Sequence, residues 1–310
     1  MAASDQIDIL LYGLGAIGSF YAFILSRARN VRLTVVARSN YDAVKNKGLK
    51  ITMVKYPAEA QSTFDYIVCA HKAIDQPSVP KRLEPVVNEK TTIVIIQNGV
   101  GNEEPFREAF PGASILSCVT WVGARQTEPG IVAHTKSEDM QIGLFPNHSV
   151  EASLEKERLD RFASLLTQGK TIFQVVPDIQ VQRWEKVVWN AAWNSLTTLT
   201  MLDTHSWLKS SPGALPLTRR LMHEVIHVAQ NCNVPLEQSL ADLLIDKILG
   251  MHAIGSSMQV DAKNERPMEI EIILGYPVRK GKELGLSIPT LETIYIILTG
   301  MNQRFTRTVI

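Results

Sequence analysis

The sequence predicts an α/β protein, with a doubly wound parallel sheet in residues 1–175 and an all-helical domain in residues 176–310. An apolar run, Ile7–Tyr12, leads into a glycine-rich turn and then into an apolar helix that extends to about Arg27. Further strand-like runs alternate with helical stretches, which is typical of a parallel sheet. From about Val150 the apolar residues recur at helical spacing almost throughout. We therefore expect an N-terminal domain of the Rossmann type joined to a helical domain.

The elements expected after the first helix follow from short apolar runs and from helical periodicity. In the first half, strands are expected at Val31–Val36, Leu49–Val54, Tyr66–Ala70, Thr92–Gln97, Ser114–Val119, Ile131–His134 and Met140–Leu144, with a helix at Glu103–Ala109. Later, helices are expected at Leu154–Thr167, Val181–Thr200, Leu217–Asn233, Leu240–Ala253, roughly Asn264–Leu284 and Leu291–Arg304, with one strand-like insert at Thr171–Val176. A ligand cleft is expected between the two domains.

The glycine-rich turn has the pattern of a dinucleotide-binding βαβ unit. Gly13 permits the tight turn, Gly15 lets a pyrophosphate approach the backbone, and Gly18 lets the helix pack closely on the strand. The start of the helix offers unpaired N–H groups and the positive end of its dipole to phosphates. The sequence therefore predicts cofactor contacts at Gly13, Leu14, Gly15, Ala16, Ile17 and Gly18.

The end of the second strand favours NADP(H) over NAD(H). A site that prefers NAD usually has an acidic residue here, which binds the ribose 2′-hydroxyl. This chain has Ala37 followed by Arg38, and a guanidinium can pair with a 2′-phosphate that a carboxylate would repel. Ser39 and Asn40 could add hydrogen bonds, while the alternative for Arg38 is an ordinary surface arginine.

The composition excludes several classes of protein. The 310 residues are 45% hydrophobic and 20% charged, with a net charge of +1 and no basic stretch that would predict a nucleic-acid partner. Three cysteines lie in apolar surroundings without metal-binding spacing, as in a reduced intracellular protein. No secretory signal and no membrane-spanning run is found, so the sequence predicts a cytoplasmic protein without a resident metal.

A polar stripe runs along the expected helix at 181–200. Lys186, Asn190 and Asn194 recur every four positions, which places them on one face of an otherwise largely apolar helix. Such residues lower stability unless they have partners or face a wet cleft. A lysine in a partly dry cleft loses proton affinity and can donate a proton to a forming alkoxide. The alternative is a solvated helix face, for which asparagine is a poor choice.

Two features near the C-terminus are less informative. Glu269 and Glu271 cannot share a helix face, so one should be exposed while the other could face the cleft. The apolar segment Ile294–Leu298 suits either the core or the interface of a homodimer, and the core is favoured.

Taken together, these motifs resemble the ketopantoate reductase (2-dehydropantoate 2-reductase) family over nearly the whole chain. The matching motifs are Gly13-x-Gly15-Ala16-x-Gly18, Lys72, Gln97-Asn98-Gly99-Val100-Gly101, Trp184-x-Lys186-x3-Asn190-x3-Asn194, Ser256-Ser257-Met258-x2-Asp261 and Glu269-Ile270-Glu271-x3-Gly275. The resemblance implies NADPH-dependent reduction of a 2-keto acid to a 2-hydroxy acid, with 2-dehydropantoate, a precursor of pantothenate, as the first candidate substrate.

The resemblance also implies a role for each matching residue. Lys186 would be the general acid, and Glu269 would bind the substrate's hydroxyl end and help to place that lysine. Asn190 and Asn194 would orient the substrate, and Ser257 would hold its carboxylate. Asn98 and Lys72 would lie beside the cofactor, and Arg38 stands where the family has an arginine.

The chain departs from the family pattern at two positions near the substrate. Ile254 is apolar where some members have asparagine, and Met268 stands where a small hydroxyl residue commonly precedes the glutamate. The alternative is therefore a diverged member of the family that reduces another keto acid or an imine in specialised metabolism.

Two alternatives come from other classes of protein. His223-Glu224-x-x-His227 fits the zinc-peptidase pattern, but no convincing third ligand follows it. A non-enzymatic NADP(H)-binding regulator would need the nucleotide fold, yet it would have no use for Lys186 together with Glu269.

Overall fold

The computed structural model describes residues 6–37, 41 and 52–306. Contacts between residues divide the chain into two compact units. The first unit is Met1–Gln97 with Asn102–Ile179, and the second is Asn98–Gly101 with Gln180–Ile310. The sequence places the division between residues 175 and 176, and it gives no sign that the short segment 98–101 groups with the helices.

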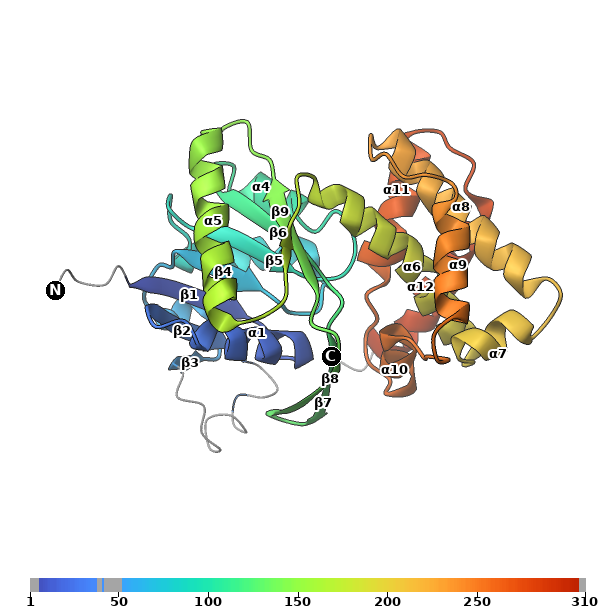
Figure 1. The fold of residues 1–310 in the computed structure, drawn as a ribbon, viewed down its shortest axis with the longest axis horizontal. Helices are drawn as coiled ribbons and strands as arrows, with labels where there is room; N and C mark the ends of the chain where they lie inside the picture. The colour runs from blue at the N-terminus through green and yellow to red at the C-terminus, as the bar shows by residue number, and fades with distance from the viewer. Residues whose placement is uncertain (1–5, 38–40, 42–51, 307–310) are drawn as a thin grey trace. The chain divides into compact units, whose positions relative to one another are not determined.

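Within its described residues, the first unit has an eight-stranded sheet in the order β10-β9-β6-β5-β4-β1-β2-β3. Neighbouring strands are parallel except for the β6–β9 pair, which is antiparallel. The strands are β1 (Ile7–Tyr12), β2 (Val31–Val36), β3 (Thr52–Val54), β4 (Tyr66–Cys69), β5 (Thr92–Ile96), β6 (Ser114–Thr120), β9 (Met140–Phe145) and β10 (Gln174–Val175). The helices are α1 (Ala16–Ser26), α3 (Val79–Leu83), α4 (Glu104–Ala109) and α5 (Ala152–Gly169), with α5 drawn across the sheet in Figure 1. The predicted doubly wound sheet is confirmed.

Both faces of this sheet are covered, as the continuous apolar strands require. Side chains of one strand alternate between two cores: Ile9 and Leu11 pack with α1 and α5, whereas Leu10 and Tyr12 pack with residues of α3 and α4. The same alternation holds along β4 and β5. Because each strand is apolar on both faces, its position in the sheet interior follows from the sequence.

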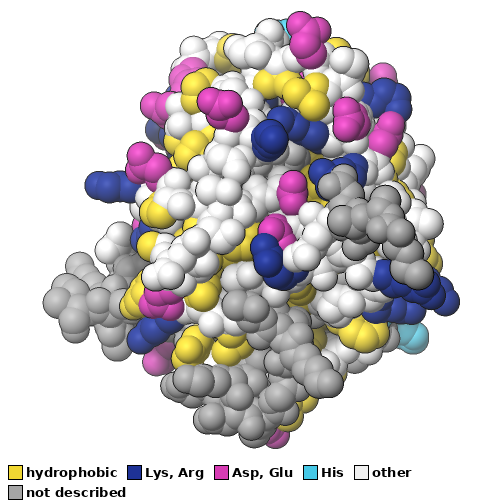
Figure 2. All heavy atoms as spheres, turned by 90° about the vertical axis from the view of Figure 1, so that its left-hand side faces the viewer, with side chains coloured by type: hydrophobic (Ala, Val, Ile, Leu, Met, Phe, Trp, Pro, Cys, Tyr) yellow, Lys and Arg dark blue, Asp and Glu magenta, His cyan; other side chains and the backbone are white. Residues whose placement is uncertain are grey.

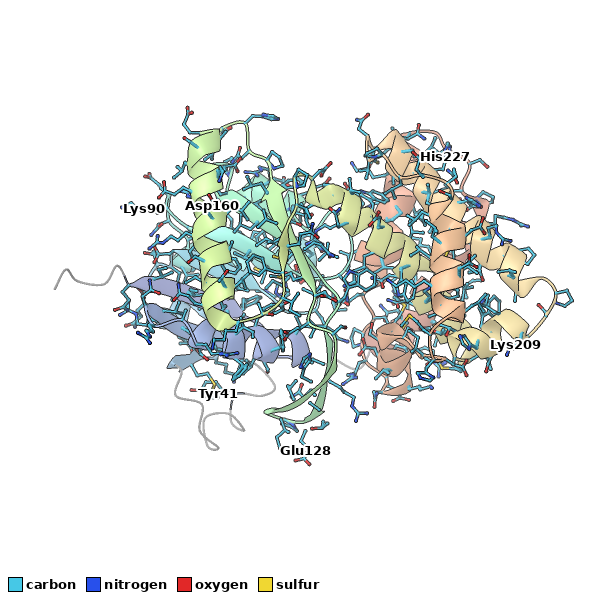
Figure 3. All side chains as sticks on the ribbon, in the orientation of Figure 1. Tyr41, Lys90, Glu128, Asp160, Lys209 and His227 are labelled. Carbon is cyan, nitrogen blue, oxygen red and sulfur yellow. The ribbon has the colours of Figure 1, made fainter. Side chains whose placement is uncertain are left out.

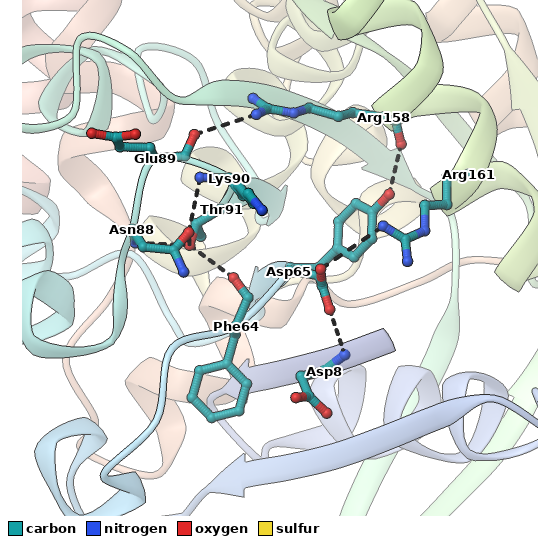
Figure 4. A network of polar contacts seen from close by, with 10 residues as sticks. Asp8, Phe64, Asp65, Asn88, Glu89, Lys90, Thr91, Arg158 and Arg161 are labelled. Atoms are coloured by element: carbon teal, nitrogen blue, oxygen red, sulfur yellow. Dashed lines mark hydrogen bonds and ion pairs between the residues drawn. The ribbon is translucent and has the colours of Figure 1, made fainter. Parts of the chain in front are cut away.

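A polar network lies at the end of the sheet where strands β1 and β4 begin (Figure 4). The Asp65 carboxylate accepts a hydrogen bond from the Asp8 amide (2.8 Å) and lies 3.8 Å from the Arg161 guanidinium of α5. The Tyr66 hydroxyl donates to the Arg158 carbonyl of the same helix (2.9 Å). These contacts hold α5 against the sheet at the N-terminal ends of the strands, opposite to the end where the glycine turn lies.

One hairpin in the first unit was not expected in full. Strands β7 (Gly123–Glu128) and β8 (Ile131–Lys136) form a separate antiparallel pair. The sequence predicts β8 but not β7, because β7 carries Arg125, Gln126 and Glu128 and has no apolar alternation.

The second unit is helical, as the sequence predicts. Its elements are α6 (Ile179–Thr200), α7 (Thr204–Lys209), α8 (Ala214–Asn231), α9 (Leu240–Leu249), α10 (Ser257–Lys263), a π-helical turn (Glu271–Gly275), α11 (Tyr276–Glu283) and α12 (Pro289–Thr306). Helix α6 is nearly surrounded by protein, and Val187, Ala191 and Trp193 are all at most 1% exposed. None of the helices in the described part of the chain is long and apolar enough to cross a membrane.

The expected helix at Asn264–Leu284 is wrong in its first part. Residues 264–269 form a turn and an extended segment, and the helical turns start only at Ile270. Pro267 explains the break, because its ring disfavours helical conformation in the residue before it. The break leaves Glu269 outside the regular helix. The short helices α7 and α10 were also not expected, and neither was α3 in the first unit.

Acidic and basic side chains are interspersed over the face shown in Figure 2. This mixed surface agrees with the net charge of +1.

Candidate active site

The turn between β1 and α1 has the backbone geometry that its glycines predict. Gly13 has φ +107°, and a Cβ there would lie 2.6 Å from the backbone of His71. A Cβ on Gly18 would lie 1.9 Å from the Gly13 carbonyl oxygen, so the helix packs directly on the turn. At Gly15 a Cβ would meet no atom within 4 Å. Two glycines are therefore needed for packing, and the third leaves open space beside the backbone.

The start of α1 is suited to an anion. Gly15 is its N-cap and supplies no side-chain hydrogen bond, and the first turn contains no acidic residue. Ala16 and Ile17 in this turn are partly exposed, whereas Leu14 is buried. The partly positive helix end and the open space at Gly15 fit the phosphates of a dinucleotide.

Two other predicted cofactor residues belong to this unit. Arg38 lies outside the described residues, although the end of β2 at Val36 and the buried Ala37 bring the chain to that position. Lys72 is exposed and follows the end of β4 by three residues.

The sequence analysis missed a buried amide network at the carboxyl ends of β4 and β5. The Gln97 side chain donates to the His71 carbonyl (2.8 Å) and accepts from the Gln76 side chain (2.7 Å). The His71 ring packs edge-on against Tyr12, with the ring centres 4.7 Å apart. Ligands of open α/β sheets bind at this edge. A polar glutamine directly after the apolar strand Thr92–Ile96 is the signal that could have indicated it.

The polar stripe of α6 lies in a largely buried environment. Asn190 and Asn194 are 6% and 5% exposed, and Lys186 is partly buried. The Asn190 side-chain nitrogen is buried without a hydrogen-bond partner. An unsatisfied buried donor is costly, and such a group commonly awaits a ligand. The stripe is therefore not a solvated helix face.

The electrostatic environment of Lys186 makes its ammonium unusually acidic. Its pKa is lowered to about 8, mainly by burial and in addition by the positive guanidinium of Arg183, three residues earlier on α6. The Glu269 carboxylate acts in the opposite direction by favouring the charged amine. A lysine with this pKa can give up a proton near neutral pH.

Glu269 and Asn98 are brought together although they are 171 positions apart in the sequence. The Asn98 side-chain nitrogen donates to a Glu269 carboxylate oxygen at 3.3 Å. Glu271, in contrast, is partly exposed and accepts from Arg279 (2.8 Å) and from the Tyr295 hydroxyl (2.8 Å). Of the two glutamates, Glu269 is therefore the one associated with Lys186.

The two neighbouring serines have different environments. Ser256 is the buried N-cap of α10: its hydroxyl accepts from the Gln259 amide (3.0 Å) and from the Thr197 hydroxyl (2.8 Å). Ser257 is exposed at the first position of the helix. Ser256 therefore has a structural role that its sequence position did not reveal, and Ser257 is the serine exposed to solvent.

The histidine motif of the rival hypothesis lies on α8, where Figure 3 labels His227. Both carboxylate oxygens of Glu224 accept backbone hydrogen bonds at the start of α12, from Thr290 (3.1 Å) and Leu291 (2.8 Å). His223 contacts the Gln238 side chain. Across the described ranges, no group of three His, Cys, Asp or Glu side chains could hold a metal ion. Glu224 thus caps a helix, and the motif does not form a peptidase centre.

Comparison with known proteins agrees with this geometry. The family description "Ketopantoate reductase PanE/ApbA" matches residues 9–147, and its C-terminal counterpart matches residues 178–302. The chain belongs to the ketopantoate reductase family. This is a family of oxidoreductases.

Individual relatives cover almost the whole chain. A 2-dehydropantoate 2-reductase of Nostoc sp. is 24% identical over 95% of both chains. The crystal structure of 2-dehydropantoate 2-reductase from Methylococcus capsulatus is 30% identical, with a TM-score of 0.84 over 96% of this chain and 98% of that one. A D-mandelate dehydrogenase determined with NADH and anilino(oxo)acetate is 19% identical, with a TM-score of 0.85 over 97% and 99%, and shares the fold.

Proposed function

We propose that this protein uses NADPH to reduce a 2-keto acid to a 2-hydroxy acid, with 2-dehydropantoate as the first candidate substrate and Lys186 as the general acid. The observation that carries the proposal is the environment of Lys186. Its pKa is lowered to about 8 in a partly buried site, Glu269 acts on the amine, and the amide of Asn190 on the same helix is buried without a partner. The family and its 2-dehydropantoate 2-reductase members support the choice of substrate.

Residues 13–18 would hold the dinucleotide pyrophosphate at the start of α1, and Lys72 and Asn98 would contact the rest of the cofactor. When bound, the nicotinamide supplies the hydride that reaches the ketone carbon. The choice of NADPH over NADH rests on Arg38 and on the missing acidic residue at the end of β2. A D-mandelate dehydrogenase of the same fold was determined with NADH, which supports a nicotinamide cofactor but not the preference for its phosphorylated form.

The protein residues complete the reaction by handling charge and protons. As the ketone is reduced, negative charge develops on its oxygen, and the Lys186 ammonium stabilises this charge more in the transition state than in the ground state. Lys186 then transfers one proton to that oxygen and is reprotonated from solvent. Glu269 keeps the ammonium charged and binds the hydroxyl end of the substrate. The Asn190 and Asn194 amides orient the substrate, and the Ser257 hydroxyl donates a hydrogen bond to the substrate's carboxylate.

The experiment is a panel of 2-keto acids followed by the loss of NADPH absorbance, with Lys186→Ala as the comparison. The panel includes 2-dehydropantoate, branched and aromatic 2-keto acids and a cyclic imine, because Ile254 and Met268 depart from the family pattern. We expect Lys186→Ala to lower turnover about 10²–10⁴-fold, the usual contribution of general acid catalysis. NADPH affinity, measured by fluorescence, should change little.

Two outcomes would contradict the proposal. Unaltered turnover in Lys186→Ala would remove this residue from the mechanism. Tight NADPH binding without oxidation by any keto acid or imine would favour a non-enzymatic regulator.

A further inference from the structure

The segment Asn98–Gly101 follows β5 in the chain but groups with the second unit. Two hydrogen bonds hold it there. The Val100 amide donates to the Ile272 carbonyl (2.9 Å), and the Arg183 guanidinium donates to the Gly99 carbonyl (2.8 Å). A Cβ on Gly99 would lie 2.3 Å from the Ile272 carbonyl oxygen, so the two backbones are in direct contact.

The Ile272 carbonyl is free for this contact because of the π-helical turn. The Tyr276 amide, which would bond to Ile272 in a regular α-helix, bonds instead to the Glu271 carbonyl. The next possible donor would be the amide of residue 277, but this residue is proline and has no N–H. The sequence thus leaves one helical carbonyl without a donor on its own helix. The Val100 amide supplies that donor.

Arg183 is an unusual residue for this position. It is 1% exposed, and it lies three residues before Lys186, on the same side of α6. Burying a guanidinium is costly unless its N–H groups find acceptors, and the Gly99 carbonyl is one of them. The same side chain therefore contacts the segment that carries Asn98 and lies beside the lysine.

We propose that Arg183 is a positioning residue that, together with the Ile272 carbonyl, clamps residues 98–101 so that the Asn98 amide holds the Glu269 carboxylate beside Lys186. The inference rests on the proposed role of Lys186. The chain of contacts runs from Arg183 to Gly99, through the backbone to Asn98, and on to Glu269 (3.3 Å). The charged groups that act on Lys186 are Arg183 from its own helix and Glu269 from the segment before the π-helical turn.

Three substitutions of Arg183 separate its charge from its hydrogen bond. Arg183→Lys keeps the charge, Arg183→Gln keeps a neutral donor, and Arg183→Met removes both. The control is Arg279→Met, which removes a guanidinium that is bonded to Glu271 near the same turn but does not contact residues 98–101. If Arg183→Met fails to fold, Arg183→Gln still removes the charge and tests its effect on the pH dependence of the reaction.

The first measurement is hydrogen–deuterium exchange of residues 98–101 in the cofactor-free protein, which does not depend on any activity. We expect exchange at Val100 to become about tenfold faster or more in Arg183→Met, the usual consequence of losing a charged hydrogen bond. Arg279→Met should leave this exchange unchanged. Unaltered protection in Arg183→Met would overturn the clamp even if the keto acid reductase activity is confirmed.

The second measurement is the pH dependence of kcat/KM. The high-pH limb is the pH range in which kcat/KM declines as Lys186 loses its proton. Removing the Arg183 charge should move this limb to higher pH by about half a pH unit or more in Arg183→Met and Arg183→Gln, because a nearby positive charge no longer opposes the protonated lysine. Arg183→Lys should keep the limb in place while lowering kcat. A limb that stays fixed in all three variants, with only thermal stability reduced, would show a merely structural role.

Discussion

At the scale of single residues, the proposed function depends on how the protein changes the acidity of the Lys186 amine. An exposed lysine has a pKa near 10.4 and holds its proton too firmly to donate it efficiently at neutral pH. Burial and Arg183 bring the pKa of Lys186 to about 8, while Glu269 limits the shift. The sequence indicated the position of this lysine, because Lys186, Asn190 and Asn194 share a helical period. It could not indicate the contact between Arg183 and the Gly99 carbonyl, because these two residues are far apart in the sequence.

This pKa predicts the pH dependence of the reaction. The proton donor is the charged form of Lys186, which predominates below pH 8 and is lost as the pH rises through that value. We therefore expect kcat/KM to fall about tenfold for each pH unit above 8, provided that Lys186 is the titrating group. Initial rates at saturating NADPH between pH 6 and 10 test this. A rate that stays constant up to pH 10 would be incompatible with a donor of lowered pKa.

The same pKa shift has a consequence for stability. Because the folded pKa lies below the unfolded one, folding favours the neutral amine. Charging a partly buried lysine therefore costs stability, in full at pH values below about 8 and progressively less as the pH rises from there to the unfolded pKa. The proposed catalytic role would account for keeping a residue that carries this cost.

At the scale of elements, most helices and strands followed from the residue pattern, and the exceptions have specific causes. Strand β7 is polar on both faces, so no alternation marked it. The segment before Glu269 leaves the helical pattern because of Pro267. Pro277 has no N–H to offer the Ile272 carbonyl, which the sequence shows, but the sequence does not show that the Val100 amide binds this carbonyl instead. Local pattern thus predicts elements well. It fails where a backbone group is satisfied by a distant segment.

The glycine turn allows packing and binding to be tested separately. We expect Gly18→Ala to destabilise the protein by roughly 1–3 kcal/mol or more, because the added Cβ would overlap the Gly13 carbonyl at 1.9 Å. Gly15→Ala should leave stability nearly unchanged, since its Cβ meets no atom within 4 Å, but should weaken NADPH binding by occupying the open space. Denaturant unfolding and NADPH titration measure the two effects.

The control for both variants is Gly112→Ala, another position where a Cβ meets nothing within 4 Å but which lies outside the turn. It should change neither property. Equal NADPH affinity in Gly15→Ala and the wild type would mean that phosphates do not approach this part of the backbone.

At the scale of the whole molecule, the two units are linked three times, because the chain passes between them at residues 97–98, 101–102 and 179–180. The first two crossings were hidden in the sequence, where Gln97-Asn98-Gly99 follows a strand like any ordinary turn. As a result, Asn98 is contributed by the N-terminal half of the sequence to the unit that contains Lys186 and Glu269. No single division of the sequence therefore yields the complete second unit, which contains Asn98, Lys186 and Glu269.

The net charge of +1 also bears on cofactor choice, since a nearly neutral protein has little overall field to attract an additional phosphate. The proposed preference for NADPH over NADH therefore has to come from local contacts, and Arg38 is the residue that the sequence suggests for them. A cofactor present at 100 times its Kd stabilises the folded protein by about 2.7 kcal/mol. We expect Arg38→Ala to reduce the rise in Tm caused by NADPH while leaving the rise caused by NADH unchanged.

Arg29→Ala provides the matched control, because Arg29 is an exposed arginine of the same unit that precedes β2 rather than following it. Its melting temperatures with both cofactors should equal those of the wild type. If Arg38→Ala lowered the two cofactor effects equally, Arg38 would support the fold or the adenosine in general, and selectivity for the 2′-phosphate would have to come from other residues. A selective loss with NADPH alone would instead locate the discrimination at the end of β2, where the charge of a single side chain decides which nucleotide the enzyme uses.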